Sequence, residues 1–154
     1  LAALAAVVVW GAARANGRMM EVKMWTESMT QLHAASAHFP IALLLSSAFF
    51  DAAGLVSRRT DLRAAGFWSL LAGTLGAVAT VVLGFLGNPF AGDTSEIAAK
   101  VIAHQRVGVA TAILFGLLTV RRVARGSRLT RLEGFLYALM TLAGIVVVSV
   151  TGYL

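Results

Sequence analysis

Four apolar runs, each long enough to cross a lipid bilayer, constrain the fold of this chain more than any other feature. They cover about residues 38–56, 64–87, 101–120 and 132–154. About 20 apolar residues in a helix cross a hydrocarbon core of roughly 30 Å. Because lipid offers the backbone no hydrogen-bond partners, each of these runs must form a helix. The sequence therefore predicts an all-α integral membrane protein whose residues 38–154 form a four-helix bundle.

The composition supports this class and excludes several others. Hydrophobic residues make up 58% of the chain and charged residues 13%, against about 45–50% and about 25% in soluble domains. The net charge is +6, but the basic residues gather in short loops between apolar runs, which is typical of membrane orientation. We therefore expect lipid as a partner and no nucleic acid. The chain has no cysteine, which excludes iron–sulfur clusters and the attachment of c-type haem.

The residues before the first complete run fall into two segments. Residues 1–18 begin with an apolar stretch and are interpreted as an N-terminal membrane anchor, which would be a fifth span. A signal peptide is the alternative, because residues 13–15, Ala-Arg-Ala, have the small-x-small form of a cleavage site. Residues 19–37 mix apolar and charged side chains and predict a short interfacial helix on the periplasmic side, with Trp25 at the depth of the headgroups.

Arginines gather in the two loops that follow the first and third runs. The positive-inside rule places such loops in the cytoplasm. We therefore expect a multi-pass protein of the bacterial inner membrane with its histidines near the periplasmic face. Asp51, near the inner end of the first run, is expected to pair with an arginine of the first loop. The loop arginines are Arg58, Arg59, Arg63, Arg121, Arg122, Arg125, Arg128 and Arg131.

Three histidines are the candidates for a cofactor site. His38 opens the first run, where Pro40 suits the first turn of a helix because its missing N–H would have no partner there. His104 lies one turn into the third run, which crosses in the same direction. The two imidazoles share one depth and can face each other across the bundle core, where haem and metal sites are commonly built. We expect His38 and His104 to be the axial ligands of a haem iron, with another metal, a proton site or a structural role as alternatives.

His33 is interpreted as a reserve ligand or as a group that supports a ligand. It lies five residues before His38, about 140° around a helix, so the two do not share a face unless Pro40 kinks the chain. Arg106, with Lys100 and Gln105 beside it, lies where haem propionates would emerge. Alternatively, Arg106 extends to the headgroups or pairs with a nearby acid.

A flat macrocycle needs space beside its ligands, and small residues supply that space. One small residue follows each of His38 and His104 by a turn, and glycines share an arc of about 80° in the second run. Such a face receives either a flat ring or a close-packed helix, and both interpretations remain open. These small residues are Ala42, Gly108, Gly73, Gly76 and Gly84.

The first run resembles a bacterial membrane-protein family catalogued as domain of unknown function family 2231. The resemblance rests on Leu32-His33, four residues, then His38-Phe39-Pro40-Ile41, with Phe50-Asp51 late in the run and a further histidine in the third run. It covers about residues 33–154. It implies a four-span module that binds b-type haem, with His38 and His104 at the matching positions.

Together these patterns favour a membrane subunit that holds haem b. It would pass electrons between the quinone pool and a periplasmic cytochrome or oxidoreductase, with other membrane subunits, in a respiratory or photosynthetic complex. No nucleophile, acid pair or phosphate loop is visible, so we expect the haem rather than the protein to carry the chemistry. The alternative is a cofactor-free structural or assembly subunit. A small transporter is a third interpretation, which the scarcity of polar residues in mid-span disfavours.

Overall fold

The computed structural model describes residues 2–88, 95–126, 138–139, 141–147 and 149. Three long helices account for most of them, α1 (Ala2–Val56), α2 (Thr60–Leu86) and α3 (Glu96–Arg125), and further helical turns occur at 138–139 and 141–147. The described residues contain no strand, so the predicted all-α class is confirmed.

Each long helix has the length and composition to cross a membrane. The candidate spans are Arg14–Val56, Thr60–Leu86 and Glu96–Ala124. They correspond to the first three predicted runs, which confirms a membrane protein with several spans. Most of the fourth predicted run, 132–154, lies outside the described residues. Where it is described, a Cβ added at Gly144 would lie 2.7 Å from the ring of Phe115, so this segment packs against α3.

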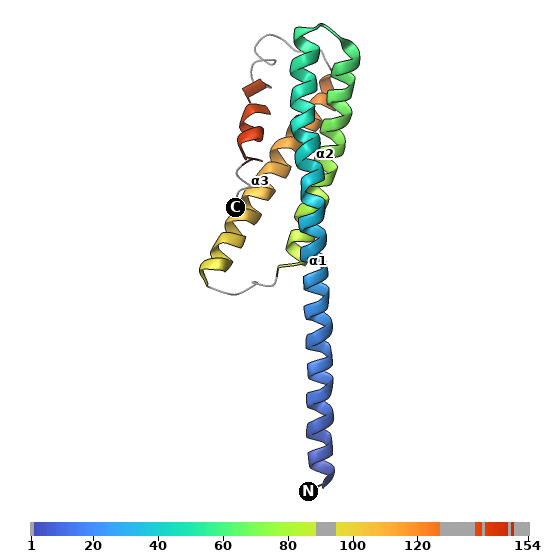
Figure 1. The fold of residues 1–154 in the computed structure, drawn as a ribbon, viewed down its shortest axis with the longest axis vertical. Helices are drawn as coiled ribbons and strands as arrows, with labels where there is room; N and C mark the ends of the chain where they lie inside the picture. The colour runs from blue at the N-terminus through green and yellow to red at the C-terminus, as the bar shows by residue number, and fades with distance from the viewer. Residues whose placement is uncertain (1, 89–94, 127–137, 140, 148, 150–154) are drawn as a thin grey trace.

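The helices α1 and α2 form an antiparallel hairpin in a single register (Figure 1). A Cβ added to any glycine of the interface would come within about 3 Å of the facing helix, so the small residues allow close contact between the two helices. The glycine face predicted in the second run is therefore used for helix packing. The pairs that define the register are Gly87–Thr30, Gly84–His33, Gly73–Leu44, Gly66–Asp51 and Gly54–Arg63.

Pro40 lies inside α1, and the prediction that it begins a helix is wrong. A proline in a helix interior removes one backbone hydrogen bond, a loss that membrane helices tolerate when neighbouring helices pack around it. Pro40 is buried, and a Cβ added at Gly76 would lie 3.3 Å from its ring. Residues 19–37, expected as a separate interfacial helix, are therefore the middle of one continuous helix.

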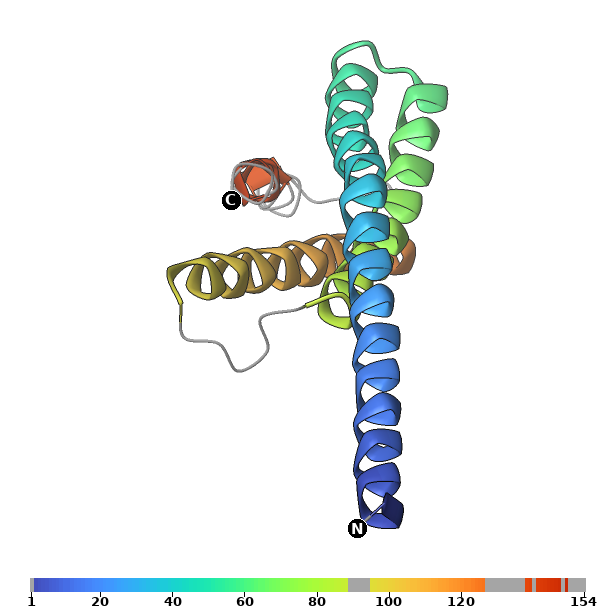
Figure 2. The same cartoon turned by 60° about the horizontal axis from the view of Figure 1, so that its bottom comes forward.

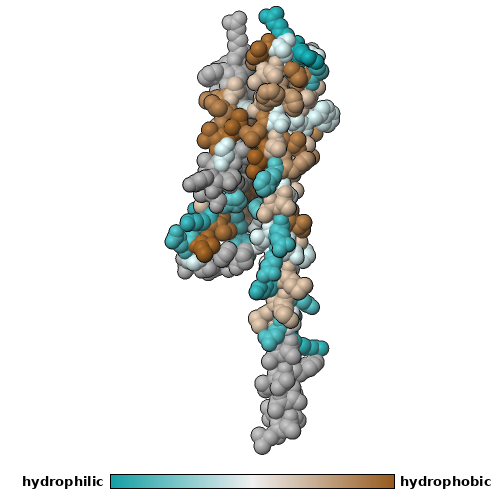
Figure 3. Space-filling view, in the orientation of Figure 1, coloured by the Kyte–Doolittle hydropathy of each residue, from teal (hydrophilic) through white to brown (hydrophobic). Residues whose placement is uncertain are grey.

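The N-terminal part of α1 extends well beyond the other helices (Figures 1 and 2). We call residues 2–29 the arm, because α1 meets the end of α2 at Thr30, whose hydroxyl donates to the Gly87 carbonyl at 2.7 Å. Large apolar side chains are exposed over the bundle, while hydrophilic residues alternate with exposed apolar ones along the described surface of the arm (Figure 3). Exposed apolar surface on the bundle is what lipid contact requires.

α3 packs against the hairpin at a steep inclination (Figure 2). Ser95 caps its first turn, because the Ser95 hydroxyl accepts from the Ala98 N–H at 3.2 Å. In the interior, the Thr74 and Thr119 hydroxyls are 2.9 Å apart and join α2 to α3. The apolar core around this contact consists of Leu44, Leu70, Ala77, Phe115 and Leu118.

A partly buried ion pair ties all three helices near the α1–α2 turn. Arg122 of α3 donates to the carboxylate of Asp51 in α1, and its second terminal nitrogen donates to the backbone carbonyl of Arg63 in α2 at 2.7 Å. The guanidinium also lies 5.8 Å from the centre of the Phe67 ring. The partner that the structure gives Asp51 is thus on α3, whereas the sequence pointed to the first loop. There, Arg59 pairs with Asp61 at 2.5 Å, and the hydrogen bond to that carboxylate raises the pKa of Arg59.

Candidate functional site

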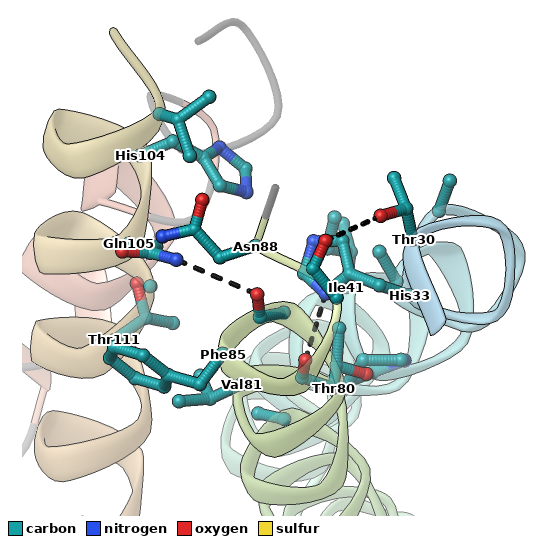
Figure 4. A pocket seen from close by; sticks show the side chains of 18 of the residues that line it. Thr30, His33, Ile41, Thr80, Val81, Phe85, Asn88, His104, Gln105 and Thr111 are labelled. Carbon is teal, nitrogen blue, oxygen red and sulfur yellow. Dashed lines mark hydrogen bonds between the residues drawn. The ribbon is translucent and has the colours of Figure 1, made fainter. Parts of the chain in front are cut away.

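A cavity of about 660 Å³ lies among α1, α2 and α3, in the half of the bundle nearer the arm. This volume is within the range of cofactor and small-molecule sites, which is about 300–1,000 Å³. Of the 22 described residues that line it, ten are aliphatic or aromatic, three are glycines and nine carry polar side chains (Figure 4). The polar side chains are Thr30, His33, His38, Thr80, Asn88, Lys100, His104, Gln105 and Thr111.

Two of the three histidines meet in this cavity. The ring centroids of His33, from α1, and His104, from α3, are 5.8 Å apart, and the ring planes are inclined at 81°. Both side chains are partly buried. The continuous α1 helix brings His33 level with the end of α2, where α3 also passes. The site therefore joins residues that are 71 positions apart in the chain (33 to 104).

A backbone hydrogen bond determines how His33 presents its second nitrogen. The His33 Nδ1 atom is 2.8 Å from the Thr80 carbonyl oxygen (Figure 4). A carbonyl can only accept, so Nδ1 carries the proton and Nε2 of the neutral ring retains its lone pair. Such a hydrogen bond orients a metal-binding imidazole and increases its basicity. His33 is thus prepared to act as a ligand through Nε2.

Gly84 makes room for this arrangement. A Cβ at that position would lie 3.0 Å from both Nδ1 and Cε1 of His33, so any larger residue would press on the imidazole. The Gly84 carbonyl also accepts from Nε2 of Gln105 at 3.5 Å, which links α2 to α3 beside His104. The glycine face that includes Gly84 was predicted to receive either a flat macrocycle or a close-packed helix, and in the structure Gly84 packs against His33 of α1.

His38 lines the same cavity, but its side chain is exposed. The sequence pattern favours a His38–His104 pair, whereas the ring contact in the structure joins His33 to His104. The difference has one cause. A helix that began near Pro40 would leave His33 outside the bundle, while the unbroken α1 carries His33 into contact with α2.

The other predicted residues are divided between the cavity and its surroundings. Gly108 lines the cavity, where a Cβ would lie 3.8 Å from Val81. Gly73 and Gly76 pack on α1, and Ala42 is exposed and does not line the cavity. Arg106 is exposed beside a smaller hollow.

Lys100 and Gln105, which the sequence placed beside Arg106, line the main cavity. Lys100 also pairs with Glu96 at 3.2 Å on the exposed side of α3. A cation is therefore available at this point of the cavity wall.

The ligand set limits which metal could bind. Within the part of the chain that the structure describes, no three metal-ligating side chains lie together. Tetrahedral zinc sites take three or four protein ligands. Two imidazoles suffice where a macrocycle supplies the remaining donors, as for a haem iron with two axial histidines. The donor set therefore fits haem better than a bare metal ion.

The cavity and its histidines lie in a region that matches a known family. The model of the family described as predicted membrane protein (DUF2231) matches residues 29–154. The chain belongs to this family. The match includes His33, His38 and His104 of this DUF2231 protein and leaves most of the arm outside. No curated protein and no solved structure matches the chain.

Proposed function

We propose that this protein is an electron-transfer subunit that binds one b-type haem between His33 and His104. It would exchange electrons between the quinone pool and a periplasmic redox partner, within a larger complex of the bacterial inner membrane. The observation that carries this proposal is the approach of two imidazoles from α1 and α3 inside an apolar cavity. The bound haem would supply one-electron chemistry, and the protein would supply the ligands, their orientation and a low dielectric.

The spacing of the two rings supports this ligand pair. Metal–imidazole bonds are about 2 Å long, so two axial rings on one iron stand with their centroids on the order of 6 Å apart. The observed separation is 5.8 Å. Gly84 makes room for the His33 ring, and Gly108, in the cavity wall beside His104, leaves room for the edge of a macrocycle.

The polar groups of the wall would orient the macrocycle. Lys100 can pair with a propionate, since a charged donor strengthens a hydrogen bond to a carboxylate, and Gln105 can donate to the other. The apolar remainder of the cavity disfavours added charge and would thereby influence the reduction potential. The arm lies on the same side of the bundle as this site and offers a surface to a periplasmic partner.

The test is a spectrum of the purified full chain. The dithionite-reduced protein should show the sharp α-band of a six-coordinate b-type haem, and a pyridine haemochrome assay should return one haem per chain. His33→Ala and His104→Ala should each remove the low-spin signal, whereas His38→Ala, the matched control from the same cavity, should retain it. A folded preparation without haem would refute the proposal, and loss of low-spin haem only in His38→Ala would move the ligand to His38.

A cofactor-free structural or assembly subunit is the second candidate. The glycine-packed hairpin favours it, because close helix packing explains Gly66, Gly73 and Gly76 without any ligand. It offers no reason for a cavity of about 660 Å³ lined by three histidines.

A further inference from the structure

His38 is an imidazole that the proposed haem site does not use. It lines the cavity and its side chain is exposed, and the structure gives it no hydrogen bond, ion pair or ring contact within the described residues. By contrast, His33 is bonded to the Thr80 carbonyl and contacts His104. An ionisable side chain inside a membrane span is costly and indicates a function unless it is paired.

The position of His38 is at the lipid-facing rim of the cavity. It lies five residues beyond His33, which is about 7.5 Å deeper along the helix and about 140° around it. Leu45 and Phe49, seven and eleven residues further along α1 and on the same helix face as His38, are 38% and 67% exposed, as apolar side chains in contact with acyl chains would be. A ligand that reaches His38 from this side therefore arrives through the bilayer and must be lipid-soluble.

We propose that His38 orients a lipid-soluble hydroquinone and accepts one of its protons, which rests on the haem function proposed above. A neutral imidazole can accept a hydrogen bond from a phenolic hydroxyl and then take its proton near neutral pH. Ile41, one turn beyond His38 on α1 and in the wall of the cavity at this rim, gives the quinol ring an apolar surface. The remaining titratable groups of the cavity wall are His33, His104 and Lys100, of which the first two are assigned to iron and the third to a carboxylate.

Oxidation of one hydroquinone to the quinone releases two electrons and two protons. His38 accepts the first hydroxyl proton, and the second proton passes to water at the mouth of the cavity. A bound haem would supply the electron acceptor, taking the electrons one at a time, and the oxidised periplasmic partner would remove the first before the second is transferred.

The experiment uses the full chain in lipid nanodiscs, with His38→Ala and His38→Gln beside the wild type. An azidoquinone is photolysed on each protein and the labelled peptides are mapped by mass spectrometry. Haem reduction by decylubiquinol is then followed by stopped flow from pH 5.5 to 8.5. We expect His38→Ala to keep its low-spin haem and dithionite reduction, to lose labelling around residues 38–41, and to react about 100-fold more slowly with the quinol.

The glutamine variant separates the two roles of His38. Because glutamine can hydrogen-bond but cannot take the proton, His38→Gln should restore labelling while leaving quinol oxidation slow and without the pH dependence of the wild type. Wild-type labelling and rate in His38→Ala would overturn the proposal, and a wild-type rate in His38→Gln would overturn the proton-acceptor role. If the wild type holds no haem, the proposed function fails, but labelling that depends on His38 would still identify a quinone site.

Discussion

Asp51 in α1 and Arg122 in α3 form an ion pair across 71 positions of sequence, with the two side chains 20% and 14% exposed. Gly66 of α2 packs directly against the pair, because a Cβ there would collide with the Asp51 carboxylate. The same guanidinium bonds the Arg63 carbonyl. One arginine therefore connects three helices at the end of the bundle farthest from the arm.

Removing one member of this pair should destabilise the bundle strongly. Asp51→Ala removes one member of the pair with Arg122, a change that costs about 3–5 kcal/mol at buried sites. Thermal unfolding in detergent, followed by circular dichroism, should show a clear drop in Tm. The double variant Asp51→Ala with Arg122→Ala should lose less than the sum of the two single variants. Additive losses would show that the two residues act independently.

Gly84→Ala should disturb His33 without changing a ligand. The added methyl would lie 3.0 Å from the imidazole, so the ring or the helix must shift. We expect a lower haem content or a change from low-spin to high-spin haem, with the protein still folded. Gly116→Ala is the control, because a Cβ at that position of α3 would meet nothing within 4 Å, and Gly116 does not line the cavity. Equal effects of both substitutions would argue against a specific role of Gly84 in positioning His33.

Pro40→Ala should leave both helicity and haem content unchanged. α1 is already helical on both sides of Pro40, so alanine returns the backbone N–H that proline lacks and removes only the ring carbons beyond Cβ that pack near Gly76. The expected result is a circular dichroism spectrum and a haem α-band equal to those of the wild type. A loss of low-spin haem in this variant would mean that the proline ring influences the shape of α1 and thereby the orientation of the His33 side chain.

The orientation of the bundle can be measured by single cysteines, since the chain has none of its own. Ser57 in the α1–α2 turn and Asn16 in the arm are both exposed. If the arginine-rich turn is cytoplasmic, Asn16→Cys should react with an impermeant maleimide in intact cells and Ser57→Cys only after lysis. The opposite pattern would put the histidine cavity on the cytoplasmic side.

The apolar runs predicted the helices well, because span length and composition are local properties of the chain. α1 ends at the predicted Val56, and α2 ends at Leu86, one residue from the predicted end. The start of the first span was misplaced because the local preference of Pro40 suggested a helix start, whereas packing against Gly76 keeps the helix continuous.

That error changed the order of the candidate ligands. Matching His38 with His104 by depth assumed a helix that begins at the membrane surface. The contact between His33 and His104 depends on the register of α1 against α2, which the glycine pattern alone could not specify. The partner of Asp51 was missed for a similar reason, since nothing local to the first loop indicates α3.

Because α1 is unbroken, the arm and His33 belong to one continuous helix. The helix from residue 2 to residue 29 is about 42 Å long. α1 first contacts α2 at the hydrogen bond between Thr30 and Gly87. His33 lies one turn beyond that contact, inside the bundle. Because no break in α1 separates the arm from His33, a tilt of the arm about the Thr30–Gly87 contact would also turn the His33 imidazole relative to His104.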